Sequence, residues 1–158
     1  MLTRKTKYAL RALACLAREP HGSWQSVAAI AAHEKLPRKF LERILLDLNR
    51  SGFVNSRKGR EGGYTLAAPA HTLRVADVVR RMDGPLAPVP CVSITAYHRC
   101  TDCGSEASCC IRPVMKRVRD AIAEVLEHTS VADLVTPPKR NRRSDGSDRS
   151  DGSYKDAP

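Results

Sequence analysis

The stretch PRKFLERILLDLNRSGFVNSRKGREGGYTLA, from Pro37 to Ala67, decides the fold because it joins a helix to a hairpin. Pro37 suits the first turn of a helix, and Gly52 is a natural stop after it. Between them the apolar residues recur as a single helical stripe: Leu41, Ile44, Leu45 and Leu48. The pattern predicts an amphipathic helix that buries one face in a core.

The second half of the stretch has the composition of a β-hairpin. Phe53–Val54 and Tyr64–Leu66 have strand character, and the basic, glycine-rich turn RKGREGG lies between them. Gly62 and Gly63 are interpreted as turn glycines that shape this hairpin.

Two further helices are predicted upstream of this stretch. Residues 3–18 carry apolar residues at helical spacing, and Ser26 is a suitable N-cap for a second helix through VAAIAAHEK. Three helices followed by a basic hairpin are typical of a winged helix-turn-helix, whose third helix enters the major groove of DNA. A small helical bundle with a hairpin and no ligand is the alternative.

The positive charge is concentrated in this predicted DNA-binding part. The net charge is +10, and residues 1–66 contain thirteen Lys or Arg against five Asp or Glu. A basic surface binds phosphate backbones by releasing counterions, so double-stranded DNA is the expected partner. A basic face without a partner remains the alternative.

Downstream, TLRVADVVRRMDG predicts a short helix ending at Gly84, and the stiff segment PLAPVP follows it. A long helix with a near-heptad seam is then expected, formed by Ile111, Val114, Met115, Val118, Ile122, Val125 and Leu126. Such a seam favours a symmetric homodimer, because a DNA reader gains from two half-sites. Packing of the helix on its own chain is the alternative.

The predicted fold is therefore mainly α with a small β-hairpin, a winged helix-turn-helix plus a long dimerisation helix. We expect the DNA-binding domain over 1–84, a proline-rich connector and cysteine loop over 85–110, the dimerisation helix over 111–136 and a disordered tail over 137–158. Neither a membrane-spanning apolar run nor a secretory signal is evident, so a cytoplasmic location is expected.

Five of the six cysteines lie between Cys91 and Cys110. In a reducing compartment, clustered thiols indicate a metal site or a redox sensor before structural disulfides. Their spacing alone leaves an iron–sulfur cluster, a structural zinc and a metal-free thiol switch open. Of the adjacent Cys109 and Cys110, only one is expected to bind a metal centre, and Cys110 is expected to be the thiol that does not. Cys15, among apolar helical residues, is interpreted as a small core residue.

Several stretches together resemble the Rrf-two family of bacterial transcription regulators, which includes the IscR and NsrR types. LTRKTKYALRAL is similar to the opening helix of the family, and VAAIAAHEKLPRKFLERILLDLNRSGFVNSRKGREGGYTLA to its helix-turn-helix and wing. VADVVRRMDG and CVSITAYHRCTDCGSEASCCIRPVMKRVRDAI then resemble the helix after the wing and the cysteine segment. The resemblance covers roughly residues 1–135.

The resemblance implies a homodimer whose operator affinity is modulated by an iron–sulfur cluster of the 2Fe-2S or 4Fe-4S type. Zinc remains the alternative cofactor that the cysteine spacing leaves open. The resemblance implies Cys91, Cys103 and Cys109 as ligands, and Cys100 as the natural fourth. Lys7 stands where some nitric-oxide-sensing members have an aspartate ligand, and an ammonium group is a poor ligand.

The resemblance also implies roles in DNA binding. Glu42 of the third helix is the expected base-reading residue, since a carboxylate accepts from the cytosine amino group; an exposed helical glutamate without this role is the alternative. Phosphate or groove contacts are expected from the basic residues around it and in the wing: Arg38, Lys39, Arg43, Arg57, Lys58 and Arg60.

Two other classes of function are weighed against a cluster-controlled regulator. An enzyme or electron carrier is disfavoured, because no phosphate-binding loop or catalytic constellation accompanies the cysteines. A cluster-free regulator controlled by a protein partner, by zinc or by a thiol switch remains the alternative.

Overall fold

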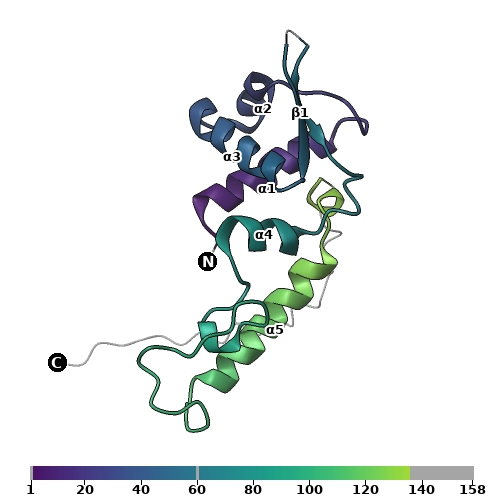
Figure 1. The fold of residues 1–158 in the computed structure, drawn as a ribbon. Helices are drawn as coiled ribbons and strands as arrows, with labels where there is room; N and C mark the ends of the chain where they lie inside the picture. Colours follow the sequence, from purple (N-terminus) through teal and green to yellow (C-terminus); the bar gives the residue numbers. More distant parts are fainter. Residues whose placement is uncertain (1, 60, 136–158) are drawn as a thin grey trace, which may run out of the picture.

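The computed structural model describes residues 2–59 and 61–135, which form five α-helices, two β-strands and two 3-10 turns. In chain order these are α1 Arg4–Ala17, α2 Val27–Glu34, α3 Arg38–Arg50, β1 Val54–Arg57, β2 Gly63–Leu66, α4 Val75–Asp83, η1 Pro90–Val92, α5 Arg112–His128 and η2 Ala132–Leu134 (Figure 1). The mainly helical winged fold expected from the sequence is confirmed.

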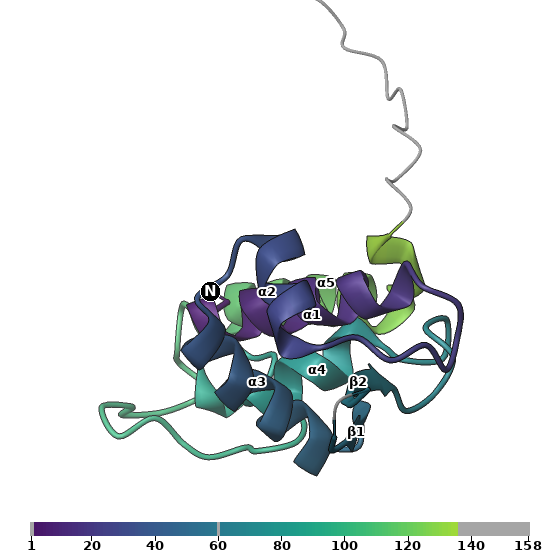
Figure 2. The same cartoon turned by 90° about the horizontal axis from the view of Figure 1, so that it is seen from above.

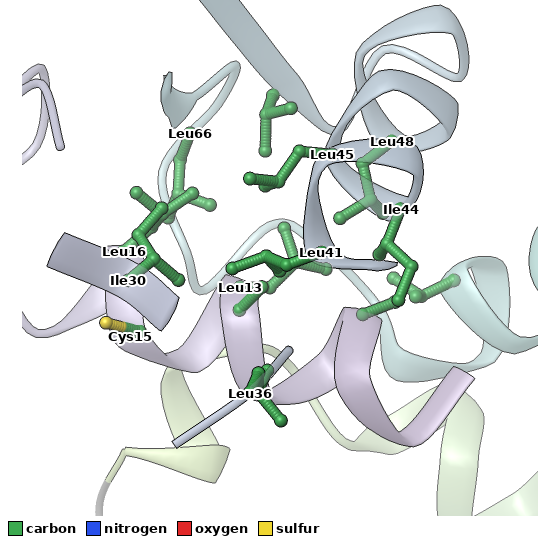
Figure 3. Packing of buried hydrophobic residues seen from close by; sticks show 14 of the residues in the cluster. Leu13, Cys15, Leu16, Ile30, Leu36, Leu41, Ile44, Leu45, Leu48 and Leu66 are labelled. Atoms are coloured by element: carbon green, nitrogen blue, oxygen red, sulfur yellow. The ribbon is translucent and has the colours of Figure 1, made fainter. Parts of the chain in front are cut away.

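The core lies where α1 to α3 meet the hairpin. Leu13 of α1 and Ile30 of α2 are inaccessible to solvent and pack with the stripe predicted on α3, Leu41, Ile44, Leu45 and Leu48 (Figure 3). Full burial of each such side chain contributes about 1.5–3 kcal/mol. Cys15, only 4% exposed, belongs to the same core, as predicted.

The helix ends follow the local signals in the sequence. The Ser26 hydroxyl accepts a hydrogen bond from the Ala29 amide at 3.1 Å, which caps α2. After α3, Gly52 adopts a left-handed conformation with φ +77°, and the Phe53 amide returns to the Leu48 carbonyl at 3.0 Å.

Gln25, just before α2, pairs with the hairpin and anchors it. β1 and β2 pair antiparallel, with Val54 opposite Leu66, and the Gln25 backbone exchanges hydrogen bonds of 2.9 and 2.8 Å with Tyr64. Gly63 makes this approach possible, since a Cβ there would lie 2.6 Å from the carbonyl carbon of Gln25. Gly63 is thus required for strand contact, beyond the turn-shaping role expected of it.

The long helix is shorter than the predicted span of 111–136, and its end is fixed by the core. It stops at His128; Thr129 is extended, and its carbonyl accepts from the Val75 amide at 2.9 Å. Val131 then donates to the Leu73 carbonyl at 2.8 Å and buries its side chain completely. This burial replaces the last turns expected for the helix.

The hairpin and the cysteine loop lie at opposite ends of the molecule (Figure 1). α4 lies between α1 and α5, with the hairpin at one end and the loop before α5 at the other (Figure 1). Seen from above, that loop also projects beyond the helices (Figure 2). None of the helices within the described ranges combines the length and apolar character needed to cross a membrane. The predicted tail, 137–158, lies outside the described residues.

Candidate nucleic-acid interface and cysteine cavity

The outer face of α3 presents the charged residues expected to meet DNA. Arg38, Lys39 and Arg43 are exposed, opposite the buried leucine stripe. The Arg38 Nε donates to the Glu42 carboxylate at 3.0 Å, with both side chains largely solvent-accessible. The proposed base reader therefore has a nearby cation that holds its carboxylate in place.

The wing carries a basic side chain held on an aromatic ring. The Arg57 guanidinium lies 4.8 Å from the centroid of the Trp24 ring, and its Nη2 donates to the Glu61 carbonyl at 2.6 Å. Lys58 beside it is exposed, whereas Arg60 lies outside the described residues. Sequence reasoning missed Trp24; its only signal was a lone tryptophan in the basic part of the chain.

A buried carboxylate clamps α2 to α1. Glu34 accepts from Arg11 Nε at 3.0 Å and from Arg18 Nη1 at 2.7 Å, and lies 3.1 Å from His33 Nδ1. Burial by itself would raise the pKa of Glu34, but the hydrogen bonds from Arg18, Arg11 and His33 outweigh it and lower the pKa.

Donor atoms of Cys15, His33 and Glu34 also lie within 4.8 Å of one another. Because two guanidinium groups already bind the carboxylate, their charge opposes a cation here. This cluster is a helix clamp, and sequence reasoning did not find it.

The five cysteines of the loop line a single cavity of about 400 Å³ between the connector and the start of α5. The structure thus brings together the four predicted ligands: Cys91, Cys100, Cys103 and Cys109. Cys91 is buried and the other three are partly buried. Cys110, set aside in the prediction, lines the same cavity but is the most exposed of the five.

Local hydrogen bonds shape the cavity walls. The Cys103 amide donates to the Cys100 carbonyl at 3.1 Å, and Arg99 Nη2 donates to the Cys103 carbonyl at 2.7 Å. The Tyr97 hydroxyl donates to Glu106 at 2.6 Å. These contacts fold the CTDC segment into a compact turn at the cavity.

The five loop thiols are free, and the pKa of the buried one, Cys91, is raised. Burial first, then a hydrogen bond with the Cys100 thiol and nearby negative charge, raise the pKa of Cys91. A metal or cluster reverses this effect, because it binds the thiolate and displaces the proton.

The donor set fits a soft metal or an iron–sulfur cluster. Five thiols share one cavity, which exceeds the three or four that such groups take up. Among the described residues, no three loop sulfurs all lie within 4.8 Å of one another, so a bound group would draw the side chains inward.

α5 presents an apolar face to solvent, although it is anchored at both ends. The large apolar side chains exposed on this face are each at least one-third accessible and follow the spacing of one helical stripe. They are Ile111, the N-cap, and Val114, Val118, Ile122 and Val125. On the other side, Arg80 of α4 pairs with Glu127. Packing on the chain itself therefore uses only part of the predicted seam.

Comparisons with known proteins agree with this architecture. The family model of Rrf2, described as an iron-dependent transcriptional regulator, matches residues 2–137. An rrf2-like HTH-type transcriptional regulator of Rhodobacter capsulatus is 41% identical over 138 residues, covering 85% of this chain and 92% of the relative.

Solved structures have the same fold. CymR, the global cysteine regulator of B. subtilis, is similar with a TM-score of 0.70 and 30% identity, over 85% of this chain and 95% of that one. T. potens IscR is similar with a TM-score of 0.67 at 23% identity, over 92% of this chain and 93% of that one. With its winged fold, basic α3 face and matching family model, the chain belongs to the Rrf2 family of DNA-binding transcription regulators.

Proposed function

We propose that this regulator binds a double-stranded operator as a homodimer and that an iron–sulfur cluster in the cysteine cavity modulates its operator affinity. The observation that carries the proposal is the convergence of five thiols on one cavity beside the first turn of α5. The loop that lines this cavity lies at the opposite end of the molecule from the wing (Figure 1). The proposed signal therefore acts at a distance from DNA.

DNA is bound by α3 and the wing. Arg38, Lys39 and Arg43 contact phosphates from the exposed face of α3, and Glu42 reads a base in the major groove. In the wing, the same type of contact is assigned to Arg57, Lys58 and Arg60. Support comes from the exposure of the described residues among them and from the concentration of positive charge in this part of the chain.

The homodimer forms through the exposed apolar face of α5. Five large side chains on one face of a helix are unfavourable in water, and a second copy of the same helix covers them without adding charge. Two copies place two recognition helices on two half-sites.

Cys91, Cys100, Cys103 and Cys109 hold the cluster, and Cys110 is the spare thiol. When bound, the cluster supplies a centre whose presence or oxidation state depends on iron, redox state or nitric oxide. The loop walls, braced by Arg99 and Glu106, then pack differently with and without it, and α5 begins at this loop.

The test begins with protein purified without oxygen, followed by its visible absorption spectrum and its iron and sulfide content. A brown protein that loses its colour in Cys100→Ser but keeps it in Cys110→Ser supports the ligand assignment. Operator affinity is then measured for cluster-loaded and cluster-free protein at one salt concentration. Equal affinities would rule out control by the cluster and leave DNA binding intact.

A metal-free thiol switch is the second candidate, because Cys91 and Cys100 are both free and line the same cavity. Under this candidate the purified protein is colourless, and mild oxidation lowers its mass by the two hydrogens of one disulfide. A colourless protein that holds one equivalent of zinc instead identifies a structural metal site.

A further inference from the structure

Arg112, the first residue of α5, forms part of the wall of the cysteine cavity. Its Nη2 lies 3.4 Å from both the Cys91 carbonyl and the Glu106 carboxylate. Its Nε is buried and has no hydrogen-bond partner among the residues that the structure describes. A charged group on the cavity wall thus has a donor left over.

Such a donor needs an explanation. Most buried polar atoms in native proteins have a partner, and one without a partner is destabilising. The surrounding chain offers Arg112 only long contacts, at 3.4 Å. The guanidinium therefore keeps hydrogen-bonding capacity for a group bound in the cavity that Arg112 lines.

The chemistry of that acceptor follows from the cavity itself. Thiolates that bind iron carry negative charge, and both they and the bridging sulfides accept N–H hydrogen bonds. A guanidinium has five N–H donors and no acceptor, so it suits such a partner. Only one carboxylate, Glu106, is paired with Arg112 among the described residues.

We propose that the Arg112 guanidinium donates a hydrogen bond to a sulfur of the iron–sulfur cluster held by the neighbouring cysteines and so sets the reduction potential and lifetime of that cluster. This inference rests on the proposed function, because it assumes that a cluster is bound. Arg112 is a positioning and tuning residue, since the cysteines alone make the bonds to iron.

The position of Arg112 gives this contact a second role. As the first residue of α5, it links the cavity directly to the helix that carries the exposed apolar face. A change in the charge or presence of the cluster alters the partner of a side chain on that helix. Arg112 therefore connects the cavity to the helix that carries the proposed dimer interface.

The experiment compares Arg112→Gln and Arg112→Lys with the wild-type protein, all loaded with cluster under anaerobic conditions. Arg112→Gln is expected to lower the reduction potential, because the more negative reduced state loses a cationic donor. It is also expected to speed the loss of visible absorbance in air by about 10-fold, the effect typical of losing an outer-shell partner. Arg112→Lys, which keeps the charge, is expected to recover part of the potential.

Arg117→Gln is the matched control, because Arg117 is an exposed arginine of the same helix and lies outside the cavity lining. An equal change in this variant would show a general charge effect and overturn the proposal. An unchanged potential in cluster-loaded Arg112→Gln would overturn it as well. A wild-type protein that binds no cluster would overturn the proposed function together with this inference, whereas the other two outcomes leave the cluster in place.

Discussion

Replacing Glu34 by glutamine is expected to destabilise the protein by about 1.5–3 kcal/mol at neutral pH. The carboxylate, whose side chain is 9% exposed, receives charge-assisted hydrogen bonds from Arg11 and Arg18. Two such bonds contribute nominally about 1.5–3 kcal/mol each. The arginine side chains are 47% and 41% exposed, so water replaces part of the hydrogen bonding that they lose. The expected loss of stability is therefore about half of the nominal sum for the two bonds.

The loss is also expected to depend on pH, with a definite sign. The pKa of Glu34 is lowered in the folded protein relative to its value of about 4.3 in an unfolded chain. A group with a lowered pKa stabilises the fold above the unfolded value and loses that contribution as the pH falls through the folded value. The difference between wild type and Glu34→Gln is therefore constant from pH 7 to 5 and shrinks below about pH 4.

Urea unfolding of both proteins, followed by far-UV circular dichroism at pH 7, 5 and 3.5, measures this difference. Glu42→Gln is the control, since its ion pair with Arg38 is exposed and contributes no more than about 0.5 kcal/mol. The reasoning would be refuted by a loss in Glu34→Gln no larger than in the control, or by the same loss at pH 3.5 as at pH 7.

Three further predictions concern the wing and α5. Gly63→Ala places a Cβ against the Gln25 backbone and is expected to weaken operator binding at least about 10-fold in fluorescence anisotropy; unchanged binding would contradict the role of this close approach. Lys58→Ala is expected to reduce the slope of log affinity against log salt concentration by about 1. Trp24→Ala is expected to weaken binding at an unchanged slope, because it only releases the Arg57 side chain from the ring. Equal slopes in the wild type and both variants would contradict a phosphate contact by Lys58. Val118→Asp puts a charge on the apolar face of α5 and is expected to yield monomers in sedimentation, while Lys116→Asp, an exposed site outside that stripe, does not.

The elements that depend on local pattern were predictable from the sequence. The leucine stripe between Leu41 and Leu48 determines α3 because its period matches the helix, and the cap at Ser26 marks the start of α2. The cysteine cavity was also predictable in part, since five of the thiols lie within twenty residues.

The contacts that were missed join segments that lie far apart in the chain. Glu34 is 23 residues from Arg11, and both α2 and α3 lie between Gln25 and Tyr64 in the chain. Contacts at such separations produce no periodic pattern in the sequence. The end of α5 was misjudged for the same reason, because burial of Val131 in a distant core ended a helix that the local pattern would continue. The cysteine spacing likewise could not show that Cys110 shares the cavity.

The attachment of the last helix has a mechanical consequence. α5 is fixed to the DNA-binding half where Ser130 pairs with Arg74 and Val131 enters the core, while its other end borders the cysteines. Its 17 residues span about 25 Å, so it is a lever with its pivot at the core. A displacement of about 2 Å at the cysteine end corresponds to a rotation of about 5° at the pivot. In a dimer formed along α5, each such rotation would move the two DNA-binding domains in opposite directions. The distance between the two recognition helices would then change by twice the movement of one.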